Sequence, residues 1–428
     1  MTENPFFNID ASLGAADVDA INKEFYGEIN YPWAPMVLPA FRDPGFWPGV
    51  INHELGREGD ARLRPDMRIW VAGCGTNQAA LTALRFPGAT VIGSDVSTTS
   101  LETCRRLADA AGIRNLELRE ESLNSIPYED EFDHIVCTGV VHHNADPAAT
   151  LKRIAAALKK DGLMEFMVYN FYHRIPTTAY QKAIRLLAGS GSAPDIEREL
   201  PITKSLIDDF PVDNQLGAFL KEQRAAPPAA IADYFLQPVE YSYTAATFDE
   251  LCRGAGLSPL SYCVNQFDNL AGRTSWYLDL ADPLVRQAYD ALDDLDRWQV
   301  TNLLLGELSP LLWFYVQRSD SGVPRRGDGE GRREFLDTVY MPRTTEIEQF
   351  RREGESYVSA GQTMAFPMPA KPADPLARQV FDNCDGYRPI RIILRALGIE
   401  QRPAVVEKLR NALITTGNPY LEPRRAED

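Results

Sequence analysis

The sequence predicts an α/β fold in which helices cover a largely parallel β-sheet. An apolar strand, a glycine turn, a helix and a second strand follow one another between Arg68 and Ser97. Further apolar runs of strand length alternate with helical patterns as far as Arg318. With 428 residues, of which 44% are hydrophobic, the chain exceeds one ordinary core. We therefore expect two domains, or one domain with large insertions.

The first strand, residues 69–72, leads directly into a turn that contains Gly73 and Gly75. Glycines let the backbone turn tightly and let a ligand approach without a Cβ in the way. The next strand, residues 90–94, ends at Asp95, twenty residues after Gly75, where nucleoside-binding folds place a carboxylate that accepts ribose hydroxyls. Taken alone, the turn could be structural and Asp95 a helix N-cap.

The residues after the turn decide which nucleoside cofactor fits. A dinucleotide fingerprint needs a small residue where this chain has Gln78. The segment VAGCGTN instead resembles motif I of the class I S-adenosylmethionine-dependent methyltransferases. It departs from the family at Val71, where an acid is usual, and at Asn77, where a third glycine is usual. Asparagine tolerates the left-handed conformation, so Asn77 is an adequate substitute.

Downstream elements follow the order of the same family. Residues 115–119 are similar to its third strand, and residues 120–127 occupy the place where it holds the adenine. The resemblance implies that Ser122 or Glu121 accepts the exocyclic amine and that the N–H of Leu123 meets a ring nitrogen. This ordered combination favours a cofactor site over the structural alternatives.

The fourth strand, residues 132–139, opens into GVVHHNADP, which resembles the family's loop GVLHH..DP. Pro147 then begins a helix with one apolar face, KKDG at 159–162 ends it, and residues 163–170 form the fifth strand. A helix at 248–255, a sixth strand at 257–264 and an antiparallel seventh at 311–318 would complete the sheet. The resemblance thus implies a Rossmann-like methyltransferase fold with seven strands in the order 3-2-1-4-5-7-6.

Family resemblance also indicates which residues hold S-adenosylmethionine and its product S-adenosylhomocysteine. They lie in the turn and at the ends of the second to fourth strands: Gly73, Gly75, Asn77, Gln78, Asp95, Val96, Ser122, Leu123, Thr138 and Gly139. Because the sulfonium already activates the methyl group, the enzyme mainly aligns the acceptor, and a general base is needed only when the acceptor must lose a proton. His143, His142 and His173 are the candidate bases, although paired histidines are more often structural.

Four stretches make up the chain. Residues 1–60 form an N-terminal segment whose Tyr26, Tyr31 or Trp33 would close over the cofactor or pack on the core. Residues 61–320 form the methyltransferase domain, with a helical cap inserted at about 171–244 that contains helices at 179–187 and 202–220. Residues 319–334, rich in glycine and charge, predict a flexible linker. Residues 335–428 predict a mostly helical accessory domain for interaction or homodimerisation, with three helices in 375–413.

Composition narrows the classes of partner. A net charge of −16 argues against a nucleic-acid acceptor, because polyanion binders concentrate lysine and arginine. The chain has neither an apolar run of membrane-spanning length nor a signal-like N-terminus, so we expect a cytoplasmic protein without a membrane partner. Its six cysteines show no C-x-x-C spacing, so no metal site is expected.

These expectations lead to three candidate functions. The first is methyl transfer to a small or medium organic acceptor. The second is methylation of a protein or peptide that the C-terminal domain recruits. The third is a binding or regulatory protein with a methyltransferase-like fold, and the missing acid at Val71 is its support.

Overall fold

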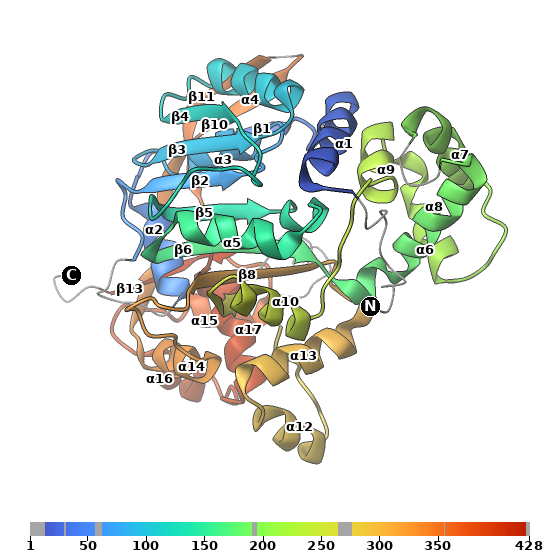
Figure 1. The fold of residues 1–428 in the computed structure, drawn as a ribbon. Helices are drawn as coiled ribbons and strands as arrows, with labels where there is room; N and C mark the ends of the chain where they lie inside the picture. The colour runs from blue at the N-terminus through green and yellow to red at the C-terminus, as the bar shows by residue number, and fades with distance from the viewer. Residues whose placement is uncertain are drawn as a thin grey trace.

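A seven-stranded mixed sheet forms the centre of the molecule (Figure 1). The structure is a computed structural model that describes residues 13–29, 31–55, 62–190, 195–263, 276–354 and 356–424. The strand order is β4-β3-β2-β5-β6-β8-β7, and β8 runs antiparallel to both of its neighbours. This confirms the predicted order. The strands are β2 (Arg68–Ala72), β3 (Thr90–Asp95), β4 (Leu116–Glu120), β5 (Phe132–Thr138), β6 (Leu158–Tyr169), β7 (Leu257–Tyr262) and β8 (Leu311–Arg318).

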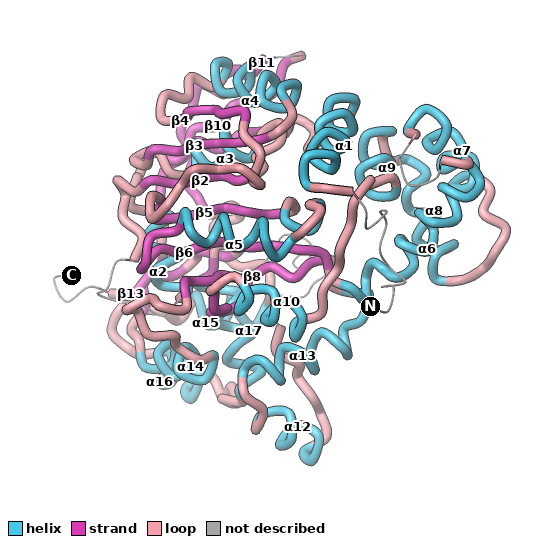
Figure 2. The backbone as a smooth tube through the Cα atoms, in the orientation of Figure 1, coloured by secondary structure: helices cyan, strands magenta, loops and turns pink. Residues whose placement is uncertain are grey.

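Helices cover both faces of this sheet, as the tube view in Figure 2 shows. One face packs on α2 (Phe46–Glu54), α3 (Gln78–Arg85) and α4 (Thr98–Ala110), and the other on α5 (Pro147–Ala157), α10 (Ala245–Gly254) and α13 (Asp294–Leu305). Successive residues of β2 point to opposite faces of the sheet. Val71 packs in the apolar core with α2, α3 and α4, and Trp70 packs in the core with α5, α10 and α13. The strands are therefore apolar on both faces, as buried parallel strands are.

The insertion after β6 is helical, as expected, and forms a cap with its own core. Its helices are α6 (Phe171–Ala188), α7 (Ile196–Asp208), α8 (Gln215–Glu222) and α9 (Pro228–Phe235). The single helix expected at 202–220 is wrong: the chain breaks at 209–214, and Asn214 caps α8 by accepting from Gly217 N at 2.8 Å. Phe25 of α1 (Ala15–Glu28) packs into the same core. Both α1 and the cap lie beyond the carboxyl ends of the parallel strands (Figure 1).

A buried ion pair joins the first helix of the cap to the segment by which the cap returns to the sheet. Arg174 of α6 donates to both carboxylate oxygens of Glu240, and each side chain is 2% exposed. The Arg174 guanidinium also lies 4.6 Å from the ring centre of Tyr169 at the end of β6. Because a buried charge needs its partner, this pair fixes how α6 leaves the sheet.

The C-terminal region contains more β-structure than its sequence predicted. Three short helices lie where expected, at α15 (Pro375–Phe381), α16 (Ile390–Ala396) and α17 (Pro403–Ile414). A long hairpin, β10 (Thr345–Glu353) and β11 (Ser356–Phe366), precedes them and pairs with β1 (Val37–Phe41) near the N-terminus. β9 (Tyr340–Pro342) pairs with β13 (Leu421–Pro423). The linker expected at 319–334 is wrong in its second half, because α14 (Asp328–Asp337) begins within it.

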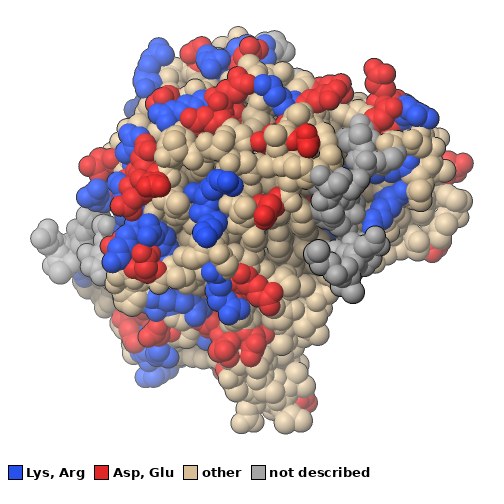
Figure 3. Space-filling view, viewed as in Figure 1, with Lys and Arg blue, Asp and Glu red and all other residues tan. Residues whose placement is uncertain are grey.

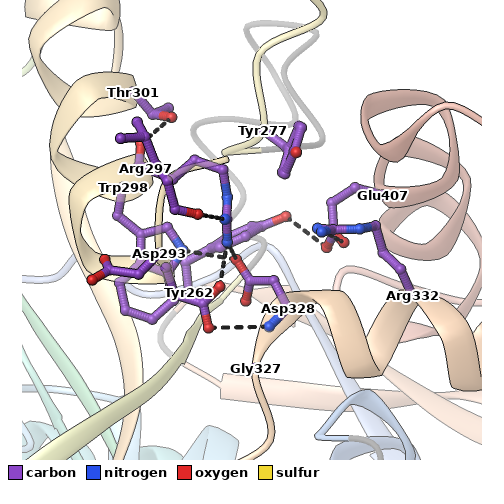
Figure 4. Close-up of polar contacts among 12 residues, drawn as sticks. Tyr262, Tyr277, Asp293, Arg297, Trp298, Thr301, Gly327, Asp328, Arg332 and Glu407 are labelled. Atoms are coloured by element: carbon purple, nitrogen blue, oxygen red, sulfur yellow. Dashed lines mark hydrogen bonds and ion pairs between the residues drawn. The ribbon is translucent and has the colours of Figure 1, made fainter. Parts of the chain in front are cut away.

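Polar contacts join α14 and α17 to the methyltransferase domain, as Figure 4 shows. Asp328 at the start of α14 accepts from Arg297 at 2.6 Å and from Trp298 Nε1 at 3.1 Å, both on α13. Tyr262 at the end of β7 donates to Glu407 of α17 at 3.3 Å. α14 and α17 are therefore docked by buried polar groups, beside β7 and α13.

The described residues include no helix that combines the length and the apolar character needed to cross a bilayer. Lysines and arginines alternate with acidic residues on the face drawn in Figure 3.

Substitution of Glu240 by Gln should destabilise the protein by about 3–5 kcal/mol, because Arg174 is left as an unpaired buried charge. Urea denaturation measures this loss. Asp249→Asn is the control, since it removes the partner of Arg253, whose side chain is 63% exposed, and should cost at most about 1 kcal/mol. Equal losses in the two variants would contradict a structural role for the buried pair.

Candidate active site

Asp95 links the ends of β2 and β3. Its Oδ2 accepts from the backbone N–H of Gly75 at 2.8 Å, and its Oδ1 from that of Ser97 at 2.9 Å. Gly75 has φ +52° and Gly73 has φ +67°, where a side chain is strained. A Cβ on Gly73 would also lie 2.5 Å from the Val140 side chain. Both predicted turn glycines are thus required by the backbone.

The Asp95 carboxylate is suited to a ribose. It is half-buried, and burial raises its pKa, with backbone N–H groups opposing the shift. Each carboxylate oxygen has lone pairs beyond the one its N–H donor uses, so two hydroxyls could still donate to it. The neighbouring Gly73, Gly75, Val96 and Gly139 are also half-buried, so this edge retains accessible surface around Asp95.

The residues expected around the adenine lie under α1. Ser122 is half-buried and its hydroxyl donates to Asp19, while Leu123 is 5% exposed. Glu121, the alternative to Ser122, accepts from the Tyr128 hydroxyl at 2.5 Å instead. Ser122 and Glu121 are both half-buried, so the choice between them stays open. The structure also brings the Asp19 carboxylate to this place, for which the sequence offered no local signal.

Gln78 and Asn77 take up different roles. Gln78 donates to the Thr138 hydroxyl at 2.5 Å, which joins the start of α3 to the end of β5. Asn77 is 4% exposed and has φ −152°, so the left-handed conformation expected for it is wrong. Its side-chain amide donates to the Trp33 carbonyl at 3.0 Å. Asn77 therefore holds the N-terminal segment.

That segment lies directly on the glycine turn. The Thr76 hydroxyl donates to the Pro32 carbonyl, and a Cβ on Gly75 would lie 3.0 Å from Pro32 Cδ. Trp33 keeps 59% of its surface exposed. Segment 31–36 is thus placed where the sequence expected a lid.

His142 and His143 lie side by side after β5, with ring centres 4.1 Å apart. The His142 ring is 0% exposed and its centre lies 4.2 Å from that of the tilted Tyr169 ring. Within the described chain, neither of its nitrogens has a hydrogen-bond partner. Burial lowers the pKa of His142 well below its ordinary value and that of His143 to about 4. His143 Nδ1 is 2.6 Å from the Val239 carbonyl. Both rings are therefore neutral packing elements in this conformation.

His173 is held on both sides. Its Nδ1 is 2.6 Å from the Glu307 carbonyl and its Nε2 is 2.7 Å from the Tyr234 hydroxyl. Burial lowers its pKa as well. The structure does not bring His173 together with the two other histidines, and a role of any of the three as a base stays a prediction.

A carboxyl group that the sequence did not single out lies beside this edge. Asp233 of α9 is 7% exposed and accepts from Gln237 Nε2 at 2.8 Å and from the Tyr31 hydroxyl. Gln237 in turn contacts the Tyr26 hydroxyl at 2.9 Å. Burial raises the pKa of Asp233 to about 7, although the Arg174 charge opposes the shift.

Tyrosines connect Asp233 with the cofactor edge. Burial, and then the Asp233 charge, raises the pKa of Tyr26 and Tyr169, and the Asp233 charge is the main cause of the raised pKa of Tyr31. The Asp95 charge also contributes to the raised pKa of Tyr26. Each of these three side chains retains partial exposure.

Three features are typical of a nucleoside-binding α/β domain of the methyltransferase type. They are the glycine turn, the carboxylate after the second strand, and the helical cap beyond the carboxyl ends of the strands. Residues 70–166 match the family model of the methyltransferase domain. This match supports a class I S-adenosylmethionine-dependent methyltransferase, a family whose cofactor is S-adenosylmethionine.

The similar proteins differ in how much of this chain they cover. An uncharacterized protein of Synechococcus sp. is 27% identical over 345 residues, which are 73% of this chain and 79% of that protein. The ubiquinone biosynthesis O-methyltransferase of Paracidovorax citrulli is 32% identical over 105 residues, so the match spans 24% of this chain and 44% of that enzyme. The structure of PKMT2 from Rickettsia typhi in complex with AdoHcy has a TM-score of 0.57 at 13% identity, covering 92% of this chain and 78% of that one. The last similarity shows that the fold is shared.

Replacement of Asp95 by Ala should weaken binding of S-adenosylhomocysteine by roughly 1.5–3 kcal/mol for each ribose hydrogen bond lost. Isothermal titration calorimetry measures the change. Because Asp95 also accepts from Gly75 and Ser97, a melting curve of the same variant must show that it is folded. Unchanged affinity in a folded variant would remove Asp95 from the site.

Proposed function

We propose that the protein transfers a methyl group from S-adenosylmethionine to a small or medium organic acceptor. The observation that carries this proposal is a set of polar contacts beyond the sheet edge. Asp233 accepts from the Tyr31 hydroxyl and from Gln237, and Tyr31 and Pro32 lie against Gly75, whose N–H donates to Asp95. These contacts join the expected cofactor edge to a second, buried set of polar groups. The groups come from α1, from α9 and from segment 31–36, which favours an acceptor that can be enclosed.

The residues at the edge suit the cofactor. Asp95 would accept the ribose hydroxyls, Ser122 and the Leu123 N–H would face the adenine, and Gly73, Gly75 and Gly139 would leave room for the remainder. When bound, S-adenosylmethionine supplies a methyl group that its sulfonium has already activated. The protein then has to orient the acceptor and exclude water.

Asp233 is our candidate for the group that receives the acceptor's proton. S-adenosylmethionine would supply the methyl group and leave as S-adenosylhomocysteine, and the Asp233 carboxylate would accept the O–H or N–H proton that the acceptor gives up. A pKa of about 7 suits this role near neutrality. The histidines are less suited, because His142 is wholly buried and His143 and His173 contact backbone carbonyls.

Two other functions have weaker support. Recruitment of a protein acceptor by the C-terminal helices is disfavoured, because α14 and α17 dock near β7 and α13 and not at the carboxyl edge (Figure 1). The support for a purely regulatory role would be the missing acid at position 71. However, Val71 is 0% exposed within the sheet core, and Asp95 remains accessible.

The proposal is tested with the full chain, cell extract and an isotopically labelled methyl donor, followed by mass spectrometry. Label in the small-molecule fraction is the expected result. Label confined to protein would support the second function. No saturable binding of S-adenosylhomocysteine would contradict both enzymatic functions.

Asp233→Asn should lower the turnover rate by about 10²-fold or more at saturating cofactor, because the amide cannot accept the proton. With the natural chain the rate should rise with pH through about 7, as Asp233 loses its proton, and then level off. The variant should lack this rise. Labelled methyl transfer to the acceptor identified above, followed from pH 5.5 to 9, measures both effects.

The charged or titratable side chains that face Asp233 are Tyr26, Tyr31, Tyr169, Arg174 and Glu240. The pKa values of the three tyrosines are raised above their ordinary value, so the tyrosines do not titrate in this pH range. Asp213→Asn, in an exposed part of the same cap, is the matched control and should leave the profile unchanged. A pH rise that persists in Asp233→Asn would contradict the assignment.

A further inference from the structure

The hairpin β10–β11 belongs to the core of the methyltransferase domain. Ile347 and Tyr357 are buried in the same apolar cluster as α2, α3 and α4, whereas the C-terminal helices form a separate cluster. Phe366 at the end of β11 contacts Phe41 edge-on, with ring centres 5.1 Å apart. The hairpin therefore packs with the elements around the cofactor edge, although it lies far along the chain.

Strand β1 connects this hairpin to the segment over the glycine turn. β1 pairs with β10 along its whole length, from Val37 opposite Arg351 to Phe41 opposite Ile347. Segment 31–36 immediately precedes β1. The position of this segment is therefore determined at its C-terminal end by the hairpin.

Four carbonyls of the segment are held from two sides. On the side of the glycine turn, Thr76 donates to the Pro32 carbonyl and Asn77 to that of Trp33. On the side of the hairpin, the Tyr357 hydroxyl donates to the Pro35 carbonyl at 2.6 Å, and the backbone N–H of Arg352 to that of Met36 at 3.0 Å. The segment spans the distance between the cofactor turn and β10–β11.

We propose that the hairpin is a functional part of the cofactor site and that Tyr357 is a positioning residue. By fixing the Pro35 carbonyl, Tyr357 keeps Tyr31 and Pro32 over Gly75 and so slows dissociation of the cofactor without touching it. Tyr357 is 7% exposed, and its hydrogen bond to Pro35 is partly buried, so its loss costs more than that of an exposed hydrogen bond. This inference rests on the cofactor site of the proposed function.

The test compares Tyr357→Phe with the natural chain, using S-adenosylhomocysteine as the ligand. Loss of one hydrogen bond should weaken affinity about 2- to 10-fold, mainly through faster dissociation. Hydrogen exchange in segment 31–36 of the complex should become faster. In turnover, the KM for the cofactor should rise while kcat at saturation changes little. A purely structural role would not raise the KM for the cofactor while leaving kcat nearly unchanged.

Tyr387→Phe is the matched control, because Tyr387 is 76% exposed and lies elsewhere in the C-terminal region. It should leave affinity and exchange unchanged. If the natural chain binds S-adenosylhomocysteine and Tyr357→Phe binds it equally well with unchanged exchange, the inference is overturned while the proposed function stands. If the natural chain itself does not bind, the proposed function fails.

Discussion

The hydrogen bonds from the backbone N–H groups of Gly75 and Ser97 to Asp95 are the constraint on which the rest of the site depends. They bring the end of β2, the start of α4 and a carboxylate together at one edge of the sheet. The parallel strands β2 to β6 place their carboxyl ends at that edge, so the groups expected around the ribose, the adenine and the methyl group meet there. The same hydrogen bonds partly offset the cost of burying the Asp95 charge.

The surroundings of this edge come from distant parts of the chain. α1 supplies Asp19 and Tyr26, α9 supplies Asp233, and the C-terminal hairpin fixes the segment that lies on Gly75. The buried Arg174 and Glu240 pair keeps the cap in place beside Tyr169. Burial then outweighs the attraction of Arg174 for the Asp233 carboxylate, so this group can change protonation near neutral pH.

The central sheet was predictable from sequence because its signals are local: apolar strands, the turn with Gly73 and Gly75, and a carboxylate at a fixed spacing. The hairpin was not, because β10 is largely polar, most of β11 is exposed, and the pairing of β10 with β1 depends on contacts between distant residues. Asp233 carries no motif, since its environment arises only when α9 folds against α1. Asn77 was misjudged because its contact with Trp33, and not a left-handed turn, explains its presence.

A crystal structure of the complex with S-adenosylhomocysteine tests the central claim most directly. The account predicts the ribose hydroxyls within hydrogen-bond distance of Asp95, the adenine beside Ser122 and Leu123, and the sulfur on the side of Asp233. A ligand bound away from this edge, or an edge that stays filled by segment 31–36 at saturating ligand, would contradict it.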